Sequence, residues 1–212
     1  MKVYALFGLA MALTTVGVLM GTLFAPTLFR SGMHIALLIV ELGIVFSARY
    51  WITKSPLNIL LFGLFPLLSG ITITPYLWYV TSSFPNGNAI LVNALLATVF
   101  MTAAAAVFAR TTSLPLASMG RFLLFGLIGL IGFGLLQIFV PALRQSIGFE
   151  MALSGAGVLL FAAFTAFDFQ RVQQQSRAGA NPFLLALSLY LDIFNLFLYI
   201  LRFMTALSGD RR

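Results

Sequence analysis

Two aspartates lie inside long apolar stretches of the sequence, where ionisable side chains are costly and are candidates for function by default. Asp168 and Asp192 stand at equal distances from residue 180, in the turn-forming pair Gly179-Ala180. If the two stretches are consecutive antiparallel helices, the two carboxyls reach the same depth and can touch. Two carboxyls in contact cannot both ionise cheaply, so we expect them to share one proton. The alternative is that each aspartate separately caps a backbone group or meets an arginine such as Arg171.

The stretch that contains Asp192 carries a stripe of polar residues. Its members follow one another at steps of four, three, four and three residues, which places them on one face of a helix. They are Ser188, Asp192, Asn195, Tyr199 and Arg202. Leucine, isoleucine and phenylalanine fill the other faces. A polar stripe on an apolar helix is expected to face the bundle interior or a water-filled path. Ser188, Asn195 and Tyr199 are therefore predicted to line a pore, with a purely structural hydrogen-bonded stripe as the alternative.

Glu41 and Arg202 are predicted to form a structural ion pair. Each lies about 12 Å, at the helical rise per residue, from the same end of the predicted bundle, and their charges are opposite. Arg49 lies two turns beyond Glu41 on the same stretch, near the expected depth of the aspartates. It is either their counter-ion, and so a possible latch for the pair, or a solvated anchor at the membrane surface.

The composition requires a lipid environment around these residues. Hydrophobic residues make up 61% of the chain and charged residues 8%, whereas a soluble domain carries about 25% charged residues. The 212 residues allow seven spans of about 20 residues each with short loops. We therefore expect an all-α membrane protein, a seven-helix bundle forming a single transmembrane domain over residues 1–212, with Pro26 ending the first helix. The predicted spans are 3–25, 33–52, 57–80, 89–109, 122–143, about 149–175 and 183–207.

The remaining composition excludes several kinds of site. The chain has no cysteine and one histidine, His34, so disulfides, cysteine-based zinc sites and a two-histidine metalloprotease motif are absent. The net charge of +7 comes from scattered basic residues and forms no patch suited to nucleic acid. Basic residues are more frequent on one side of the predicted bundle, which places the N-terminus in the cytoplasm and the C-terminus outside. That side holds Lys2, Arg49, Lys54, Arg110, Arg121, Arg171 and Arg177, against Arg30, Arg144, Arg211 and Arg212 on the other.

The sequence resembles the Bax inhibitor-1 family, also called the transmembrane Bax inhibitor motif family, in its short bacterial form. The resemblance rests most on the C-terminal third and extends over the whole order of spans. Its segments are Phe164-Thr165-Ala166-Phe167-Asp168-Phe169-Gln170, Ala186-Leu187-Ser188-Leu189-Tyr190-Leu191-Asp192-Ile193-Phe194-Asn195-Leu196-Phe197 and Leu201-Arg202-Phe203, and more weakly Ser69-Gly70-Ile71-Thr72-Ile73-Thr74-Pro75 and Ala97-Thr98-Val99-Phe100.

This resemblance implies a seven-helix fold with the last helix at its centre and a pH-sensitive calcium leak across the membrane. It makes Asp168 and Asp192 the paired pH sensor, and Glu41 with Arg202 a structural ion pair. The sequence departs from similar proteins at one place. Their arginine that latches the aspartates lies about a turn later in the second span, where this chain has Ile52.

The function expected from these features is that of a calcium-permeable leak channel or slow transporter, gated by protonation of the aspartate pair. Calcium prefers about six to eight oxygen ligands, so Asp168 and Asp192, even with Asn195 or Ser188, would hold it weakly and transiently. Weak coordination suits permeation, because the ion must also leave. We expect no catalysis and no cofactor; calcium is the permeant ion, protons are the regulator, and the lipid bilayer is the constant partner.

Three other functions remain open at this point. The protein could act as a regulator that binds protein partners, such as a membrane protease or death-pathway proteins. It could be an intramembrane aspartyl protease, although Asp192 follows Tyr190-Leu191 and lacks the Gly-x-Gly-Asp surroundings of that class. It could also be a proton-coupled transporter of another solute. In each case the expected location is a membrane, the cytoplasmic membrane of a bacterium.

Overall fold

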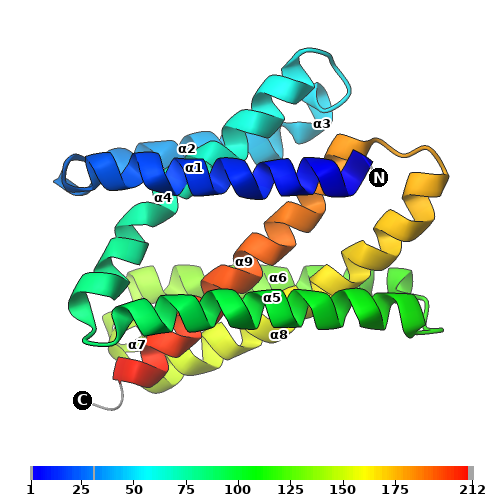
Figure 1. Cartoon of the computed structure of the whole chain (residues 1–212). Helices are drawn as coiled ribbons and strands as arrows, with labels where there is room; N and C mark the ends of the chain where they lie inside the picture. The colour runs from blue at the N-terminus through cyan, green and yellow to red at the C-terminus, as the bar shows by residue number, and fades with distance from the viewer. Residues whose placement is uncertain (1, 31, 210–212) are drawn as a thin grey trace. The chain divides into compact units, whose positions relative to one another are not determined.

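The computed structural model describes residues 2–30 and 32–209, apart from the side chains of residues 25–30, His34, Arg144 and Arg177. In these ranges all regular elements are helical (Figure 1). They are α1 (Lys2–Arg30), α2 (Met33–Phe46), α3 (Ala48–Trp51), α4 (Leu57–Ser83), α5 (Gly87–Thr111), η1 (Leu116–Met119), α6 (Gly120–Phe139), α7 (Pro141–Gln145), α8 (Ile147–Arg177) and α9 (Pro182–Gly209). Four side chains used in the charge comparison, those of Arg30, Arg144, Arg211 and Arg212, lie outside this description, as does that of Arg177.

Six of the described helices are long enough and apolar enough to cross a membrane, and they are α1, α4, α5, α6 with its leading turn η1, α8 and α9. The second predicted span is shorter than expected, because α2 has 14 residues and Ser47 separates it from α3. Fourteen residues rise about 21 Å, against a hydrocarbon core of about 30 Å. An all-helical membrane protein is thus confirmed, whereas the count of seven spans is not.

Two predicted helix ends were wrong. The fifth span was expected to reach residue 143, but α6 ends at Phe139, and the backbone is extended at Val140 before α7 begins. The first helix continues past Pro26 and ends at Arg30, and α4 likewise contains Pro66 and Pro75 within its length. Membrane helices tolerate internal prolines because neighbouring hydroxyls and helices satisfy the freed backbone groups.

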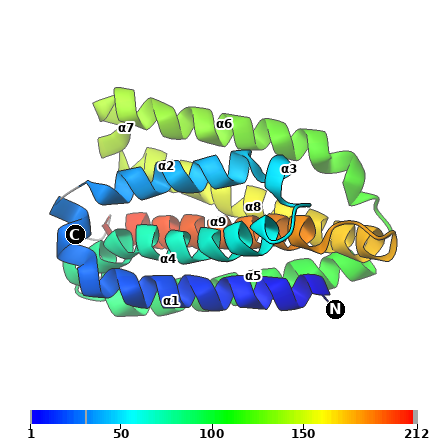
Figure 2. The same cartoon turned by 90° about the horizontal axis from the view of Figure 1, so that it is seen from above.

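The chain divides into two compact units, which are described separately: residues 1–85 with 176–190, and residues 86–175 with 191–212. In the first unit α1 packs along α4, and α2 packs on α4 as well (Figure 2). Gly17 of α1 faces Gly70 of α4 so closely that a Cβ atom on Gly17 would collide with the carbonyl oxygen of Leu67. These glycines let the two backbones touch, as small residues do at membrane helix crossings.

The start of α9 completes the first unit. Asn181 accepts a hydrogen bond from the backbone N–H of Phe183 at 2.8 Å, which caps the helix. Its side-chain amide donates to the carbonyl of Ile52 at 3.0 Å and so ties the α8–α9 turn to the segment after α3. Further along α9, the ring of Tyr190 packs edge-on against Phe65 of α4 at 5.8 Å between centroids.

The second unit contains α5, η1, α6, α7, most of α8 and the remainder of α9. Aromatic contacts join its helices: Phe149 of α8 lies against Phe133 of α6, with 6.3 Å between ring centroids. Phe161 of α8 stacks on Tyr199 of α9 at 5.4 Å. α8 therefore packs on α6 near its start and on α9 along its middle, so that the unit's polar residues on α8 and α9 face each other.

Candidate functional site

The structure brings Asp168 and Asp192 together inside the second unit. α8 ends at Arg177, Gly179 makes the turn with a φ of 81°, and α9 begins at Pro182. Both aspartates are buried, with 2% of Asp168 and 8% of Asp192 exposed. Their carboxyls lie within hydrogen-bonding reach of each other, and the buried Oδ2 of Asp192 has no hydrogen-bond partner among the described residues. A hydrogen bond between two carboxyls needs a proton on one of them, so this geometry suits a shared proton.

An arginine lies beside the pair. Arg171 lies one turn after Asp168 on α8, and its guanidinium is 3.7 Å from Oδ1 of that aspartate. The arginine side chain is 29% exposed. It also donates to the side-chain oxygen of Gln175 at 3.1 Å, and its charge acts on Asp192. The arrangement therefore combines both sequence interpretations, because the aspartates meet each other and one also meets Arg171. With one shared proton, the two carboxyls and this arginine sum to zero charge.

A buried glutamine, two residues after Asp168 on α8, binds the backbone of the segment that leads into η1. Gln170 accepts a hydrogen bond from the backbone N–H of Leu116 at 2.8 Å and donates to the carbonyl of Leu114 at 3.0 Å. These bonds hold the segment before η1 against α8, where Leu116 also packs on Ala166. Gln170 was given no role from the sequence, although an amide two residues from an aspartate in an apolar stretch is a usable signal.

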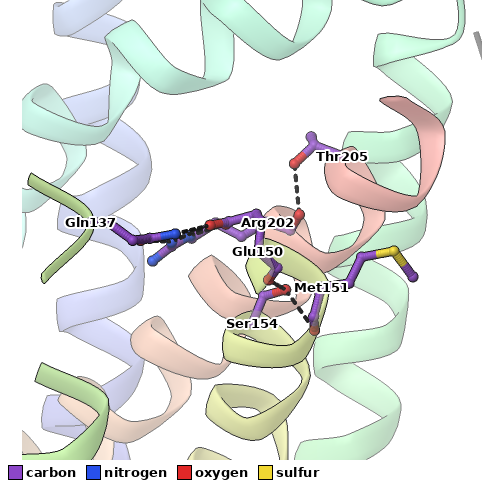
Figure 3. A network of polar contacts seen from close by, with 6 residues as sticks. All are labelled: Gln137, Glu150, Met151, Ser154, Arg202 and Thr205. Carbon is purple, nitrogen blue, oxygen red and sulfur yellow. Dashed lines mark hydrogen bonds and ion pairs between the residues drawn. The ribbon is translucent and has the colours of Figure 1, made fainter. Parts of the chain in front are cut away.

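A second polar cluster lies between α6, α8 and α9 (Figure 3). Arg202 donates to both carboxylate oxygens of Glu150, at 2.8 and 2.9 Å. Gln137 of α6 donates to Glu150 at 2.9 Å and accepts from Arg202 at 3.4 Å. The pair is partly exposed, at 30% for the arginine side chain and 25% for the glutamate. Glu150 and Gln137 were missed because both stand near the ends of apolar stretches, where a charge reads as solvated.

Glu41 has hydroxyl partners in the first unit. Ser69 of α4 donates to its Oε2 at 2.8 Å, and Thr72 of the same helix donates to its Oε1. The predicted pair of Glu41 with Arg202 joins residues of different units, and it stays a prediction. The structure gives Arg202 a partner that sequence reasoning did not consider.

Arg49 contacts its neighbour Tyr50 on the exposed surface of α3. Its guanidinium donates to the Tyr50 hydroxyl at 2.6 Å and lies over the same ring, 4.5 Å from the centroid. Both interpretations of Arg49, as a solvated anchor at the membrane surface and as a latch for the aspartates, stay predictions.

The polar stripe of α9 makes mostly local contacts. Asn195 donates to the carbonyl of Leu191 in its own helix at 2.7 Å. The ring of Tyr199 stacks on Phe161 and covers Gly157, where a Cβ atom would collide with it. Ser188 is half-buried in the first unit. These contacts suit the structural interpretation of the stripe, and a pore lined by Ser188, Asn195 and Tyr199 stays a prediction.

The aspartate pair offers few ligands for a divalent cation. Among the residues that the structure describes, no three or more His, Cys, Asp or Glu side chains gather into a possible metal site. Two carboxyls beside an arginine offer few of the oxygens that calcium prefers. Weak, transient binding of calcium at Asp168 and Asp192 stays a prediction.

Comparisons with known proteins agree with this architecture. The model of the family described as "Inhibitor of apoptosis-promoting Bax1" matches residues 1–209. An uncharacterized protein of Campylobacter jejuni is 31% identical over 98% of this chain and 88% of its own length. The inner membrane protein YbhL of Escherichia coli is 30% identical over 91% of this chain and 80% of its own, and the protein LIFEGUARD 3 of Arabidopsis thaliana is 29% identical over 87% and 72%. With a family match over nearly its full length and six helices suited to a bilayer, this chain is an integral membrane protein of the Bax inhibitor-1 family.

Proposed function

We propose that this protein is a pH-regulated calcium leak channel or slow calcium transporter, with Asp168 and Asp192 as its proton-sensing gate. The observation that carries the proposal is the buried contact between these two carboxyls on consecutive helices. Such a contact has no evident structural benefit in a membrane, where apolar residues would pack at lower cost. A proton shared between two acids gives the site two charge states, which is what a pH sensor needs.

The gate works through the balance of charge around the pair. With one proton shared, the pair carries one negative charge, which the Arg171 guanidinium offsets from 3.7 Å. Loss of that proton as the pH rises adds a second negative charge in a poorly solvated place. This charge draws a further cation, either a fixed base such as Arg49 or calcium itself. A fixed base would clamp its helix onto α8 and close the path, so acidification loosens the clamp and favours opening.

The proposal includes a seven-span bundle with α9 at its centre. Of the most apolar stretch of 18 residues in each candidate span, 56% is buried in α9, 39% in α4 and 11–22% in the others. α2, with α3, would supply the seventh crossing. The bundle then has its N-terminus in the cytoplasm and its C-terminus outside, in the cytoplasmic membrane of a bacterium, as YbhL is by its name an inner membrane protein.

No catalytic role is assigned to the aspartates in this proposal, and no cofactor is needed. Protein partners stay unassigned. The name of the matching family refers to inhibition of Bax1, a protein partner. The described loops of this chain are short, however, and short loops favour transport over a docking function. Calcium and the bilayer are the partners that the proposed mechanism uses.

The test is calcium flux into liposomes that contain the purified protein, from about pH 5 to about pH 8, the range in which a shared carboxyl proton is expected to exchange. Wild type is compared with Asp168→Asn, Asp192→Asn and the double variant. We expect a flux maximum at mildly acidic pH in the wild type, since stronger acid also weakens attraction for calcium. Each single variant should lose the pH dependence. The double variant should resemble either single one, because the two aspartates act as one sensor that either substitution already disables.

The matched control is Arg110→Gln, which removes an exposed charge at the end of α5. Its pH profile should follow the wild type, apart from a small change in overall rate. Unaltered pH profiles in both single aspartate variants would remove the pair from the mechanism. Equal flux of calcium, potassium and protons would show an unselective leak and contradict the assignment of calcium as cargo.

A further inference from the structure

A continuous line of hydroxyl groups leads to Glu41 in the first unit. Ser69 and Thr72 of α4 contact its two carboxylate oxygens. The Tyr190 hydroxyl of α9 hydrogen-bonds Ser69, and Thr14 of α1 lies 2.8 Å from Tyr190, with either hydroxyl able to donate. Four helices thus converge on one carboxyl through oxygen atoms, without a carboxylate or amine between them.

The line of hydroxyl groups can stabilise Glu41 as an ionised carboxylate. Each hydroxyl has one hydrogen to donate and lone pairs to accept. With Glu41 charged, Ser69 and Thr72 donate to it, Tyr190 donates to Ser69, and Thr14 donates to Tyr190. Every hydroxyl then points its hydrogen toward the carboxylate, and such aligned hydrogen bonds polarise one another.

The same line can stabilise a protonated carboxyl if the direction of hydrogen-bond donation reverses. The Glu41 O–H would then donate to Ser69, and Ser69 would donate to the Tyr190 hydroxyl. The tyrosine hydroxyl donates to Thr14, whose hydrogen turns to the carbonyl of Ala10 at 3.0 Å. The backbone acceptor at the end of the reversed line is therefore already in place, and every hydrogen in the line has an acceptor in either state.

The charges that face Glu41 in this unit favour the protonated state. Glu41 takes part in neither of the ion pairs found in the described part of the chain, Arg171–Asp168 and Arg202–Glu150. α4 and α1 present hydroxyls to this cluster, and the titratable group that α9 presents is Tyr190. Of the unit's described basic side chains, Lys2 lies at the start of α1, Lys54 in the exposed segment before α4, and Arg49 on Tyr50. A lone carboxylate at membrane depth is costly, and taking up a proton removes that cost.

We propose that Glu41 is a proton-binding site, separate from the aspartate pair, whose hydroxyl line through Ser69, Tyr190 and Thr14 reverses its direction of donation when the proton binds. The uptake needs one proton from water and forms one O–H bond on Glu41; the hydroxyls only turn their hydrogens. Tyr190 and Asp192 are two residues apart on α9, so their side chains leave the helix about 200° apart. The two proton sites thus lie on different faces of one helix.

The test uses infrared difference spectroscopy of the full chain between alkaline and acidic pH, in the double variant Asp168→Asn/Asp192→Asn. Of the five acidic side chains in the sequence, this background retains Glu41, Glu150 and Asp210. We expect a carbonyl band of a protonated carboxyl that vanishes in Glu41→Gln and persists in Glu150→Gln. Tyr190→Phe removes a link of the line while keeping the ring. It should shift both the band and its pH midpoint upward, because Ser69 loses the hydrogen bond that polarises its own donation to the carboxylate.

The outcomes separate this proposal from the gate. Because the aspartates are already neutral in the background, the result does not depend on whether they control calcium flux. A band that appears on acidification and depends on Glu41 supports the site, whereas a Glu41 carboxyl that stays in one protonation state across the pH range would overturn it. A protonated-carboxyl band untouched by Glu41→Gln, or a Glu41 carboxylate whose band moves with sodium concentration and not with pH, would overturn it. Glu41→Gln copies the protonated shape, so folding of this variant is expected, and a band restored by Glu41→Asp at a new frequency completes the assignment.

Discussion

Arg202 and Glu150 form a two-pronged contact that makes a measurable prediction. Removing one partner strands a charge that is only about a quarter to a third exposed. We expect Glu150→Gln to lower the free energy of unfolding by about 1–3 kcal/mol, less than a fully buried pair would lose, because water reaches part of the site. Thermal unfolding in detergent measures the loss, and Arg110→Gln, an exposed arginine elsewhere in the same unit, should be nearly neutral.

A double-mutant cycle decides between the two acids for Arg202. The coupling energy of Glu150→Gln with Arg202→Gln should be about 1 kcal/mol or more, since the two side chains share two hydrogen bonds. The same cycle with Glu41→Gln tests the pair predicted from depth. A larger coupling to Glu41 than to Glu150 would contradict the contact seen in the second unit.

Gln170 offers a further prediction for single residues. Replacing it with alanine leaves the backbone N–H of Leu116 and the carbonyl of Leu114 without their bonds. An unpaired buried polar group costs about 1–3 kcal/mol, so Gln170→Ala should lower the melting temperature clearly. Gln174→Ala, at an exposed position of the same helix, should not. Equal effects of the two changes would show that the tie to the segment before η1 contributes nothing.

Sequence reasoning at this scale succeeded where helical spacing alone fixes the outcome. The contact of Asp168 with Asp192 depends only on two helices of known direction and a short turn at Gly179, and all three were readable. The partner of Arg202 was not, because Glu150 and Gln137 come from α8 and α6, and which of several acids meets an arginine depends on helix rotation. Depth along a helix fixes only how far a side chain lies from the membrane surface. Whether two side chains meet also depends on the rotation of each helix and on which helices are neighbours.

The crossing of α1 and α4 depends on two glycines whose role can be measured. A Cβ atom on Gly70 would collide with the carbonyl oxygen of Thr14, and one on Gly17 with that of Leu67. Because these obstacles are backbone atoms, the helices must move apart, and Gly70→Ala should cost about 1–3 kcal/mol or more. Gly8→Ala in α1 meets nothing within 4 Å and should be neutral or slightly stabilising through better helix propensity. Similar melting temperatures for both variants would argue against a close crossing.

The helices themselves were predictable from apolar length, and their ends less so. α4, α5, α8 and α9 all contain the spans expected for them, since about 20 apolar residues have few alternatives in a bilayer. The end of the first helix was misplaced because Pro26 was taken as a stop, although membrane helices carry prolines internally. The second helix was read as one span because Ser47 does not interrupt the apolar pattern, yet the backbone turns there between α2 and α3.

At the scale of the whole molecule, the short helix α2 decides the number of crossings. Its 14 residues fall short of the hydrocarbon core by about 9 Å when their rise is compared with a core of about 30 Å. However, large apolar side chains on it are exposed, among them Ile35, Ile39 and Phe46, which is typical of a surface in contact with lipid. A short helix can still cross where the bilayer thins or where flanking residues extend its reach. We therefore expect α2 with α3 to cross, as the seven-span bundle requires.

Cysteine labelling from the two sides of the membrane tests this topology, and the absence of native cysteine makes every label unambiguous. Lys2→Cys and Lys54→Cys flank α1 and α2, so they label from the same side if both helices cross and from opposite sides if α2 does not. Asn88→Cys, beyond the long helix α4, is the control and must label opposite to Lys54→Cys. With seven spans, Lys2→Cys and Lys54→Cys should both label from the cytoplasmic side, and a cysteine at Ser208 from outside. Labelling of Lys2→Cys and Lys54→Cys from opposite sides would reduce the bundle to six spans and place both termini on one side. In that case α2 would lie along the membrane surface, and Arg49 could not reach the depth at which a latch for Asp168 and Asp192 must act.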